Sequence, residues 1–365
     1  MGVSPTRNVT QAEIARNLGI HQTTVSSILS NKRNDKFAPE MREKVIAAAR
    51  KLGYRPSASA RALRGVRSGL IGVFHFGRDK DVESRRLYQI IQAIHAKGYQ
   101  PLAMPMADQV MRLSRNDEIS ACTVMLDANI EGLVLSGFAD DFDLAQLKRF
   151  QEVHIPIVSI TGIKLPGIPF FGADRCQAMY QLTRHAILQG RRKLIYLHRW
   201  ASGLTDLVQN TAFAAVEGFQ QAARDHGLSF EQAIPYIKPP SDQSGLFSYG
   251  AGEQAFAEVW ESGGRPDAVL CYDDGWALGV YGYCQRHGIR IPDDVAVIGY
   301  ENQRLGNYLF PRLTTASLPY ENIASGALDY LTRALKEQPL SSEDRIVLSP
   351  CTLEVRESCG ARKPL

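Results

Sequence analysis

The chain has 365 residues, 44% of them hydrophobic and 22% charged, which is ordinary for a globular protein of roughly two to four domains. It contains no apolar run long enough to span a membrane and no apolar secretory core near its N-terminus, which predicts a cytoplasmic protein. Charge is divided unevenly: residues 1–68 hold 13 Lys and Arg against four Asp and Glu, whereas residues 69–365 hold 29 against 34. A basic head on an acidic body favours a polyanion as the partner of the head.

The first expected helix starts at a capping box, Thr10-Gln-Ala-Glu13. The hydroxyl of Thr10 can accept a hydrogen bond from the amide of Glu13, and the carboxylate of Glu13 can accept one from the amide of Thr10. The inner face of this helix holds Ile14, Ala15 and Leu18. Gly19 then allows a tight turn, so a second helix can follow directly.

A second helix is expected near residues 22–29 and a third over residues 39–52, where Pro39 favours a helix start. Apolar spacing gives each helix a buried face, with Val25, Ile28 and Leu29 in the second and Val45, Ile46, Ala49 and Leu52 in the third. The small polar residues that face outward are Gln22, Thr23, Ser26 and Ser27. Two short helices joined by a glycine turn form a helix-turn-helix, whose second helix enters the major groove of DNA. On this pattern alone, a small helical bundle without DNA binding is an equal alternative.

The stretch from Tyr54 to Arg64 contains Pro56, which can open a helix, followed by several alanines and Leu63. A helix of about eight residues is unstable alone in water, because nucleation is costly. We therefore expect this stretch to be disordered in the free protein and to fold on a partner. The alternative is a flexible linker.

From Leu70 onward, short apolar runs alternate with helical periodicity, which predicts parallel sheets covered by helices on both faces. The expected strands cover residues 70–76, 99–104, 132–135 and 156–160 in a first series and residues 193–198, 234–237, 268–272 and 295–299 in a second. The expected helices cover residues 84–97, 114–128, 142–152, 176–189, 211–226, 250–261 and 276–287. The predicted fold is a helical head joined to two doubly wound α/β lobes, whose ligands bind beyond the carboxyl ends of the strands.

The sequence contains no pattern typical of an enzyme or of a metal site. The six cysteines occur without a CxxC pair, which indicates free thiols, and they are Cys122, Cys176, Cys271, Cys284, Cys351 and Cys359. The eight histidines show no ligand spacing, and no GxSxG, P-loop or GxGxxG run occurs. Asp273 and Asp274 are adjacent at an expected strand end, so their side chains should point apart rather than share a substrate. We expect no cofactor, no metal and no catalytic activity.

The head carries two runs, E-I-A-R-N-L-G-I-x-x-T-T-V-S-S-I-L-S-N and R-E-K-V-I-A-A-A-R-K-L-G-Y-R-P-S-A-x-A-R-A-L-R. They resemble the head of the lactose-repressor (LacI/GalR) family of bacterial transcription factors. The resemblance implies base contacts from Gln22, Thr23 and Ser27. It implies phosphate contacts from His21, Thr24, Ser26, Lys32, Arg33, Arg61 and Arg64. It also implies that Ser57, Ala60 and Leu63 lie in the minor groove, where Leu63 wedges between base steps.

Two positions of the head depart from the family pattern. His21 stands where the family usually has serine, and histidine is a weaker helix cap. Ser27 stands where the family usually has arginine, and serine cannot make the two-pronged contact of arginine with guanine. We therefore expect the operator half-site to differ from the one that is most common in the family.

The body resembles the same family more loosely. Asp273-Asp-Gly-Trp-Ala-Leu-Gly279 is similar to the family segment N-D-x-x-A-x-G, and residues 311–319 are similar to its P-x-L-T-T-I-x-x-P crossover. In the family the chain crosses three times between its lobes. The resemblance implies a helix-turn-helix domain at 1–54, a hinge at 55–68, a first lobe at 69–171 with 317–340, and a second lobe at 172–316 with 341–365.

The expected effector site lies between the two lobes. By resemblance it contains Thr161, Asp174, Ala215, Tyr272, Asp273, Trp276 and Glu301. Carboxylates that accept paired hydroxyl groups, together with aromatic walls, suit a sugar or another neutral polyol. Ala215 replaces an arginine that is common in sugar-binding members, which argues against an anionic effector bound at that position. The alternative for Asp273 and Asp274 is a strand end and a helix cap without ligand contact.

The resemblance implies a sequence-specific regulator, expected to be a repressor, that binds a palindromic operator in double-stranded DNA as a homodimer. A small molecule between the lobes would change the spacing of the hinges through its different affinity for two states. A dimer is expected rather than a tetramer, because no leucine heptads follow the last expected strand. The alternative is a cytoplasmic solute-binding or sugar-processing protein whose basic end is incidental. Such a protein would have no steeply salt-dependent affinity for DNA.

Overall fold

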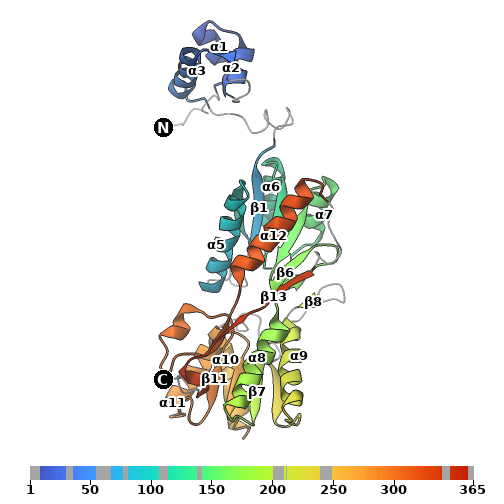
Figure 1. Cartoon of the computed structure of the whole chain (residues 1–365), viewed down its shortest axis with the longest axis vertical. Helices are drawn as coiled ribbons and strands as arrows, with labels where there is room; N and C mark the ends of the chain where they lie inside the picture. The colour runs from blue at the N-terminus through green and yellow to red at the C-terminus, as the bar shows by residue number, and fades with distance from the viewer. Residues whose placement is uncertain are drawn as a thin grey trace. The chain divides into compact units, whose positions relative to one another are not determined.

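The computed structural model describes most of the chain, which divides into two compact units, Met1–Ser68 and Gly69–Leu365 (Figure 1). We call the first unit the head and the second the body. The described residues are 9–29, 36–54, 67–76, 81–106, 114–137, 142–199, 209–210, 212–238, 249–338 and 346–360. None of the described helices is both long enough and apolar enough to cross a membrane.

Three helices form the described part of the head, and they are α1 (Gln11–Leu18), α2 (Gln22–Leu29) and α3 (Pro39–Lys51). The predicted capping box is confirmed, because Thr10 N donates to Glu13 Oε2 at 2.7 Å and Glu13 N donates to Thr10 Oγ1 at 3.3 Å. Gly19 ends α1 with a φ of 64°, in the left-handed region that glycine adopts without strain. The second helix therefore starts directly after this turn, as the sequence predicts.

The three head helices share one small core, made of Ile14, Ala15, Val25, Ile28, Val45, Ala48 and Ala49. The prediction that Ile46 faces this core is wrong, because 41% of its surface is exposed. Val45, Ala48 and Ala49 define the buried face of α3, and Ile46 lies about 100° away from Val45 around the helix axis. The core of the head is thus built from small side chains on α3, which lets the helices approach closely.

The first lobe of the body is built on a six-stranded sheet in the order β13-β6-β4-β3-β1-β2. Its strands are β1 (Leu70–Phe76), β2 (Gln100–Met106), β3 (Gly132–Ser136), β4 (Ile157–Ile160), β6 (Phe170–Ala173) and β13 (Ile346–Ser349). All neighbouring pairs are parallel. Nearly continuous burial along the central strands reflects cover on both faces of the sheet.

Helices cover both faces of this sheet, and they are α5 (Asp81–Ala96), α6 (Arg115–Asp127), α7 (Ala145–Glu152) and α12 (Tyr320–Leu335). Helices α5 and α12 pack side by side (Figure 1) and bury Ile90 and Leu328 in one apolar cluster. On the other side, α6 and α7 bury Met125 and Leu147 in a second cluster. The strand order reverses between β1 and β3, so the ligand-binding switch point of this lobe falls at the carboxyl ends of those two strands.

The second lobe has a four-stranded parallel sheet in the order β11-β10-β7-β9. Its strands are β7 (Leu194–Arg199), β9 (Ala233–Lys238), β10 (Ala268–Cys271) and β11 (Ala296–Ile298). Its helices are α8 (Arg175–Leu188), α9 (Ala212–Asp225), α10 (Tyr249–Glu261) and α11 (Asp274–Arg286). Helices α8 and α9 pack in one apolar cluster, and α10 and α11 in another. The predicted pair of doubly wound lobes is confirmed, and the second switch point lies between β7 and β10.

Three connections join the lobes. The first is Asp174, between β6 and α8. The other two contain β12 (Thr315–Ser317) and β14 (Thr352–Glu354), which pair with each other in antiparallel register. Residues 341–365 were assigned by resemblance to the second lobe, but β13 joins the first sheet beside β6. The crossing back therefore occurs after β13, a partly exposed edge strand that apolar periodicity does not reveal.

The remaining described elements are short. They are β5 (Ile163–Lys164), β8 (Gln209–Asn210) and the 3-10 helices η2 (Arg304–Asn307) and η4 (Glu357–Cys359). The two-residue strands β5 and β8 pair with each other. The helix η4 packs against β11 and so anchors the last crossing to the second lobe.

Candidate nucleic-acid interface and effector site

Helix α2 presents polar side chains on the face opposite its core residues. Gln22 and Thr23, which were predicted to contact bases, are exposed, whereas Ser27 is half-buried. Three of the predicted phosphate contacts are described. His21, just before α2, is exposed, and Thr24 and Ser26 of α2 are half-buried. The other predicted DNA contacts lie outside the described residues, and they are Lys32, Arg33, Ser57, Ala60, Arg61, Leu63 and Arg64.

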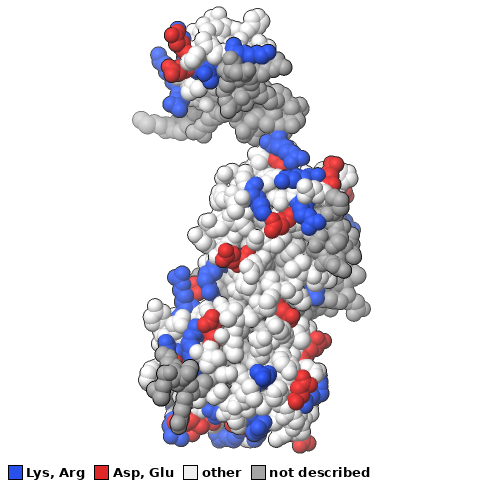
Figure 2. All heavy atoms as spheres, viewed as in Figure 1, with Lys and Arg blue, Asp and Glu red and all other residues white. Residues whose placement is uncertain are grey.

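Charge on the described surface follows the division of the chain into head and body. Figure 2 shows several Lys and Arg side chains on the head and fewer acidic ones, whereas the two signs are mixed over the body. The described basic residues of the head include Arg16, Lys36, Lys44, Arg50 and Lys51. Exposed cations near α2 would attract a phosphate backbone whatever its base sequence.

Three polar side chains form a partly buried network at the switch point of the first lobe. His75 is the penultimate residue of β1 and Ser136 ends β3, and His75 Nδ1 lies 3.1 Å from Ser136 Oγ. Arg86 of α5 donates from Nε to Ser136 Oγ at 3.0 Å and from Nη2 to the carbonyl of Phe76 at 3.1 Å. Burial, with the charge of Arg86, lowers the pKa of His75 to about 4. The cation at this switch point is therefore Arg86, because His75 is neutral at physiological pH.

Aromatic rings gather at the carboxyl ends of β7 and β10, at the switch point of the second lobe. The ring of Tyr272 lies 5.5 Å from that of His198 and 6.0 Å from that of Trp276, between ring centroids. The guanidinium of Arg175, the first residue of α8, lies 5.6 Å from the Tyr272 centroid and 4.9 Å from the Tyr300 centroid. The predicted walls Tyr272 and Trp276 thus come together, and Arg175, a cation that was not predicted, lies against Tyr272.

Asp273 and Asp274 have different structural roles. Asp273 caps α11, because its Oδ1 accepts a hydrogen bond from Trp276 N at 2.8 Å. Asp274 is 1% exposed, and its carboxylate accepts from Thr315 Oγ1 at 2.7 Å and from Gln303 N at 2.6 Å. The sequence left open a helix cap as the role of either residue, and Asp273 is the one that has it. Asp274 instead ties α11 to the crossover strand β12.

Glu301 and its neighbours bridge the two lobes. Arg85 Nη2 of the first lobe donates to the carbonyl oxygens of Glu301 at 3.1 Å and of Asn302 at 2.8 Å. Arg304 N donates to Asp81 Oδ2 of the first lobe at 3.2 Å. We call these five residues the interlobe latch. Glu301 and Asn302 have φ values of 104° and 48°, in the left-handed region, so the latch contains backbone strain.

The structure places the three remaining predicted effector residues differently from one another. Thr161 follows β4 with a φ of 60°, and its buried Oγ1 has no hydrogen-bond partner among the described residues. Asp174 caps α8 by accepting from Gln177 N at 2.9 Å. Ala215 is 3% exposed and lies in the apolar cluster of α8 and α9. It contributes packing and offers no polar group to a ligand.

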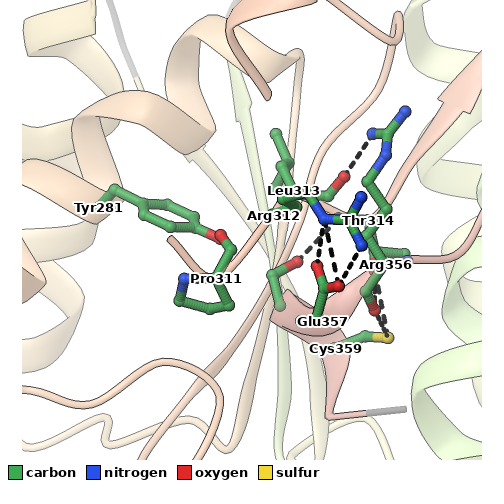
Figure 3. Close-up of polar contacts among 9 residues, drawn as sticks. Tyr281, Pro311, Arg312, Leu313, Thr314, Arg356, Glu357 and Cys359 are labelled. Carbon is green, nitrogen blue, oxygen red and sulfur yellow. Dashed lines mark hydrogen bonds and ion pairs between the residues drawn. The ribbon is translucent and has the colours of Figure 1, made fainter. Parts of the chain in front are cut away.

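The last two crossings are held together near the second lobe by a compact set of polar contacts (Figure 3). Arg312 Nε donates to both carboxylate oxygens of Glu357, at 2.9 and 3.1 Å, which lowers the pKa of Glu357 to about 2. Arg356 N donates to Thr314 Oγ1 at 2.9 Å, and Arg356 Nη1 donates to the carbonyl of Leu313 at 2.6 Å. These contacts couple the two connections, so a change in the angle between the lobes moves both together.

Comparison with known proteins assigns both parts of the chain. Residues 10–57 match the family of bacterial regulatory proteins, lacI family, and residues 183–359 match the periplasmic binding protein-like domain. The chain is 28% identical over 358 residues to catabolite control protein A of Priestia megaterium, covering 96% of this chain and 99% of that protein. It is 25% identical over 351 residues to the ribose operon repressor of Escherichia coli (strain K12), covering 94% and 98%.

The fold is similar to a solved structure of the lac repressor dimer bound to operator and the anti-inducer ONPF. That similarity has a TM-score of 0.76 at 20% identity and covers 97% of this chain and 100% of the other. The helical head and the two-lobed body therefore occur in the same order and over the same length as in these relatives. The chain is a DNA-binding transcription regulator that combines a lacI-family head with a periplasmic binding protein-like body.

Proposed function

We propose that this protein is a repressor that binds a palindromic operator as a homodimer and responds to a sugar-like effector bound between the lobes of its body. The observation that carries the proposal is α2, which exposes Gln22 and Thr23 above a buried face of Val25 and Ile28. A relative with the same fold was solved as a dimer on its operator, and another is named a repressor. Such a regulator works on the chromosome in the bacterial cytoplasm.

The side chains on α2 suit direct contact with the edges of bases. The amide of Gln22 can pair with two groups of adenine, and the methyl group of Thr23 can pack against the methyl group of thymine. Ser27 can make a single hydrogen bond with several bases, so it discriminates less than an arginine there would. His21, Thr24 and Ser26 would contact phosphates and so set the register of the helix on the duplex.

The hinge at residues 55–68 supplies the second mode of DNA contact in this proposal. Leu63 would wedge between base steps in the minor groove, and the bend it produces would allow further contacts. We expect Leu63→Ala to weaken operator affinity by about ten- to a hundredfold, because the wedge is lost while the phosphate contacts remain. Titration of labelled operator with both proteins measures the change. Equal operator affinity in the two proteins would remove the wedge from the proposal.

The effector would bind where the two switch points meet the interlobe latch. Glu301 and Asp273 offer carboxylate oxygens to hydroxyl groups, and Tyr272 and Trp276 offer ring faces to the apolar side of a sugar. Glu301 also belongs to the latch, so a ligand that contacts it changes the relative stability of the latched and unlatched states. A ligand acts on DNA affinity only through such a difference.

Selection of bound duplexes from a random DNA library by the full-length protein tests the proposed function. We expect enrichment of a palindrome of about 14 to 20 base pairs, with two arms around a deformable centre. A Gln22→Ala variant should still enrich the outer parts of each arm but lose the preference at one base pair per arm. The selection is run without added effector and again with a panel of sugars. If the effector is a co-repressor, the palindrome is enriched only when that sugar is present.

Salt dependence separates this proposal from a solute-binding protein with an incidental basic end. Operator binding through several phosphate contacts should weaken by orders of magnitude between about 50 and 200 mM salt. The regulator proposal would be contradicted if the protein binds a sugar but enriches no duplex at low salt with any sugar present. That result would favour a solute-binding protein.

A further inference from the structure

Arg175 is a largely buried guanidinium that makes no hydrogen bond to the described residues. Its side chain is 17% exposed and lies against the rings of Tyr300 and Tyr272. Glu301 Oε1 is 4.0 Å from Arg175 Nη2, which is beyond hydrogen-bonding distance. Within the described parts of the chain, no acceptor takes a hydrogen bond from any of its five N–H groups.

Other polar atoms beside Arg175 also lack partners. Tyr196 Oη and Trp276 Nε1 are buried and make no hydrogen bond to the described residues. Burial raises the pKa of Tyr196, and the positive charge of Arg175 opposes that rise. Buried polar groups are nearly always hydrogen-bonded, so these two atoms, in the same aromatic group as the partly exposed guanidinium of Arg175, indicate a ligand that supplies the missing partners.

The first lobe adds a second buried cation, which has no carboxylate partner among the described residues. Arg86 is 8% exposed, and its bonds go to the hydroxyl of Ser136 and to carbonyl oxygens rather than to a carboxylate in the described chain. Burial raises the pKa of Tyr320, and the positive charges of Arg86, Arg175 and Arg85 oppose that rise. Arg85 is paired with Asp81 at 3.4 Å and Arg175 with Glu301 at the longer distance of 4.0 Å, so Arg175 has only a distant carboxylate partner.

The nearby carboxylates are already engaged. Asp273 caps α11, and Glu301 Oε2 accepts from Gln303 Nε2 at 3.1 Å. The carboxyl of Asp274 has a pKa that burial raises to about 8, so it retains its proton at neutral pH. A buried cation without a close anion is costly, and an incoming anion removes that cost. Arg175 also begins α8, where the helix dipole adds to its attraction for negative charge.

We propose that the effector carries an anionic group, a carboxylate or a phosphate, that binds the guanidinium of Arg175 and makes this residue the determinant of specificity for acidic over neutral sugars. The inference rests on the proposed function, since it names the class of ligand for the same site. The planar fork of arginine matches either anion with two parallel hydrogen bonds. The hydroxyl groups of the ligand would meet Glu301, Tyr196 and Trp276. This proposal differs from the expected neutral polyol, which rested on the carboxylates and aromatic walls and on the absence of an arginine at Ala215, because a different arginine lies beside those walls.

Matched pairs of acidic and neutral sugars test the proposal with the full-length protein. The probes are hexonates, hexuronates and hexose 6-phosphates of the gluco, galacto and manno series, each beside its neutral polyol or hexose, with inorganic phosphate added alone. Affinity is measured by titration calorimetry and by the shift in unfolding temperature. We expect one acidic class to bind at least about tenfold more tightly than its neutral partners. The binding class, sugar acid or sugar phosphate, identifies the anion.

Arg175→Gln should weaken the binding of that acidic sugar by about ten- to a hundredfold and change the affinity for its neutral partner little. Arg175→Lys keeps the charge and should lose part of the affinity, which separates loss of pairing from loss of folding. The matched control is Arg184→Gln, an exposed arginine farther along the same helix. Unfolding temperatures without ligand show that each variant is folded.

Three results would overturn the inference: neutral sugars that bind as tightly as their acids, an Arg175→Gln protein with unchanged affinity for the acid, or a wild-type protein that responds to none of the acidic probes. Selection of operator duplexes without effector is independent of all three. An enriched palindrome together with any of these results removes Arg175 as an anion site but leaves the regulator proposal standing. Failure to enrich any duplex, with and without the acidic probes, removes the regulator proposal instead.

Discussion

Gly218→Ala is expected to destabilise the body by about 3 kcal/mol, because the new methyl group would collide with the backbone of a neighbouring helix. A Cβ atom at Gly218 in α9 would lie 2.0 Å from the carbonyl oxygen of Cys176 and 3.0 Å from the backbone nitrogen of Tyr180, both in α8. Neither atom belongs to a flexible side chain, so the two helices must move apart. The displaced turn begins with Arg175, and ligand affinity should fall together with stability.

The matched control is Gly282→Ala in α11. A Cβ atom at Gly282 would meet only the end of the Arg286 side chain, at 3.4 Å, and the residue has no left-handed φ. Replacing such a helical glycine by alanine should stabilise the helix by about 0.5 to 1 kcal/mol. Thermal unfolding should therefore place Gly218→Ala about 5 to 10 °C below the parent and Gly282→Ala at or slightly above it. Similar unfolding temperatures for the two variants would contradict the packing of α8 on α9.

Gly218 shows which features of this fold the sequence does not predict. Apolar periodicity placed each expected strand and helix of the lobes within a few residues of its observed bounds, but it did not predict β6, β13 or α12. The capping box at Thr10 and the turn at Gly19 are local features, and both are confirmed. Close approach between helices is not local, because nothing beside Gly218 in the chain shows that Cys176 will lie against it.

The candidate site was predicted less completely for the same reason. Tyr272, Trp276 and Glu301 follow strands of one sheet, so their proximity follows from topology. Arg175 stands beside the predicted Asp174, but whether its side chain turns towards Tyr300 depends on packing between distant segments. The signal that could have identified it is an arginine at the first position of the helix that opens the second lobe, directly after a crossing. The latch could not be predicted, because Arg85 reaches the carbonyl of Glu301 only when the two lobes meet at a particular angle.

Asp274 is the residue whose change should most disturb the crossings. Its side chain is the buried acceptor for both Thr315 Oγ1 and Gln303 N, and Gly299 leaves it room, because a Cβ there would lie 2.0 Å from Asp274 Oδ1. Asp274→Ala leaves the hydroxyl and the amide buried without a partner, at a cost of about 1 to 3 kcal/mol each. We expect a loss of about 3 kcal/mol near pH 6, measured as a lower urea midpoint. Asp274→Asn can accept from Gln303 N through its amide oxygen and donate from its amide nitrogen to Thr315 Oγ1, so it should be close to the parent at that pH.

The pH dependence of stability tests the protonation of Asp274 separately. Burial chiefly raises its pKa from 3.8 to about 8, against the lowering effect of the bonds from Thr315 and Gln303. The folded protein therefore holds a proton that the unfolded chain releases, so the contribution of this group is full below about pH 4 and is lost as pH rises towards 8. Asn cannot titrate, so Asp274→Asn should lose less stability than the parent between pH 5 and 8 and exceed it at pH 9. Asp293→Asn, an exposed change, should follow the parent throughout. Parallel urea midpoints for the parent and Asp274→Asn across this range would mean that Asp274 is ionised in the folded protein, and its carboxylate would then count against an anionic effector.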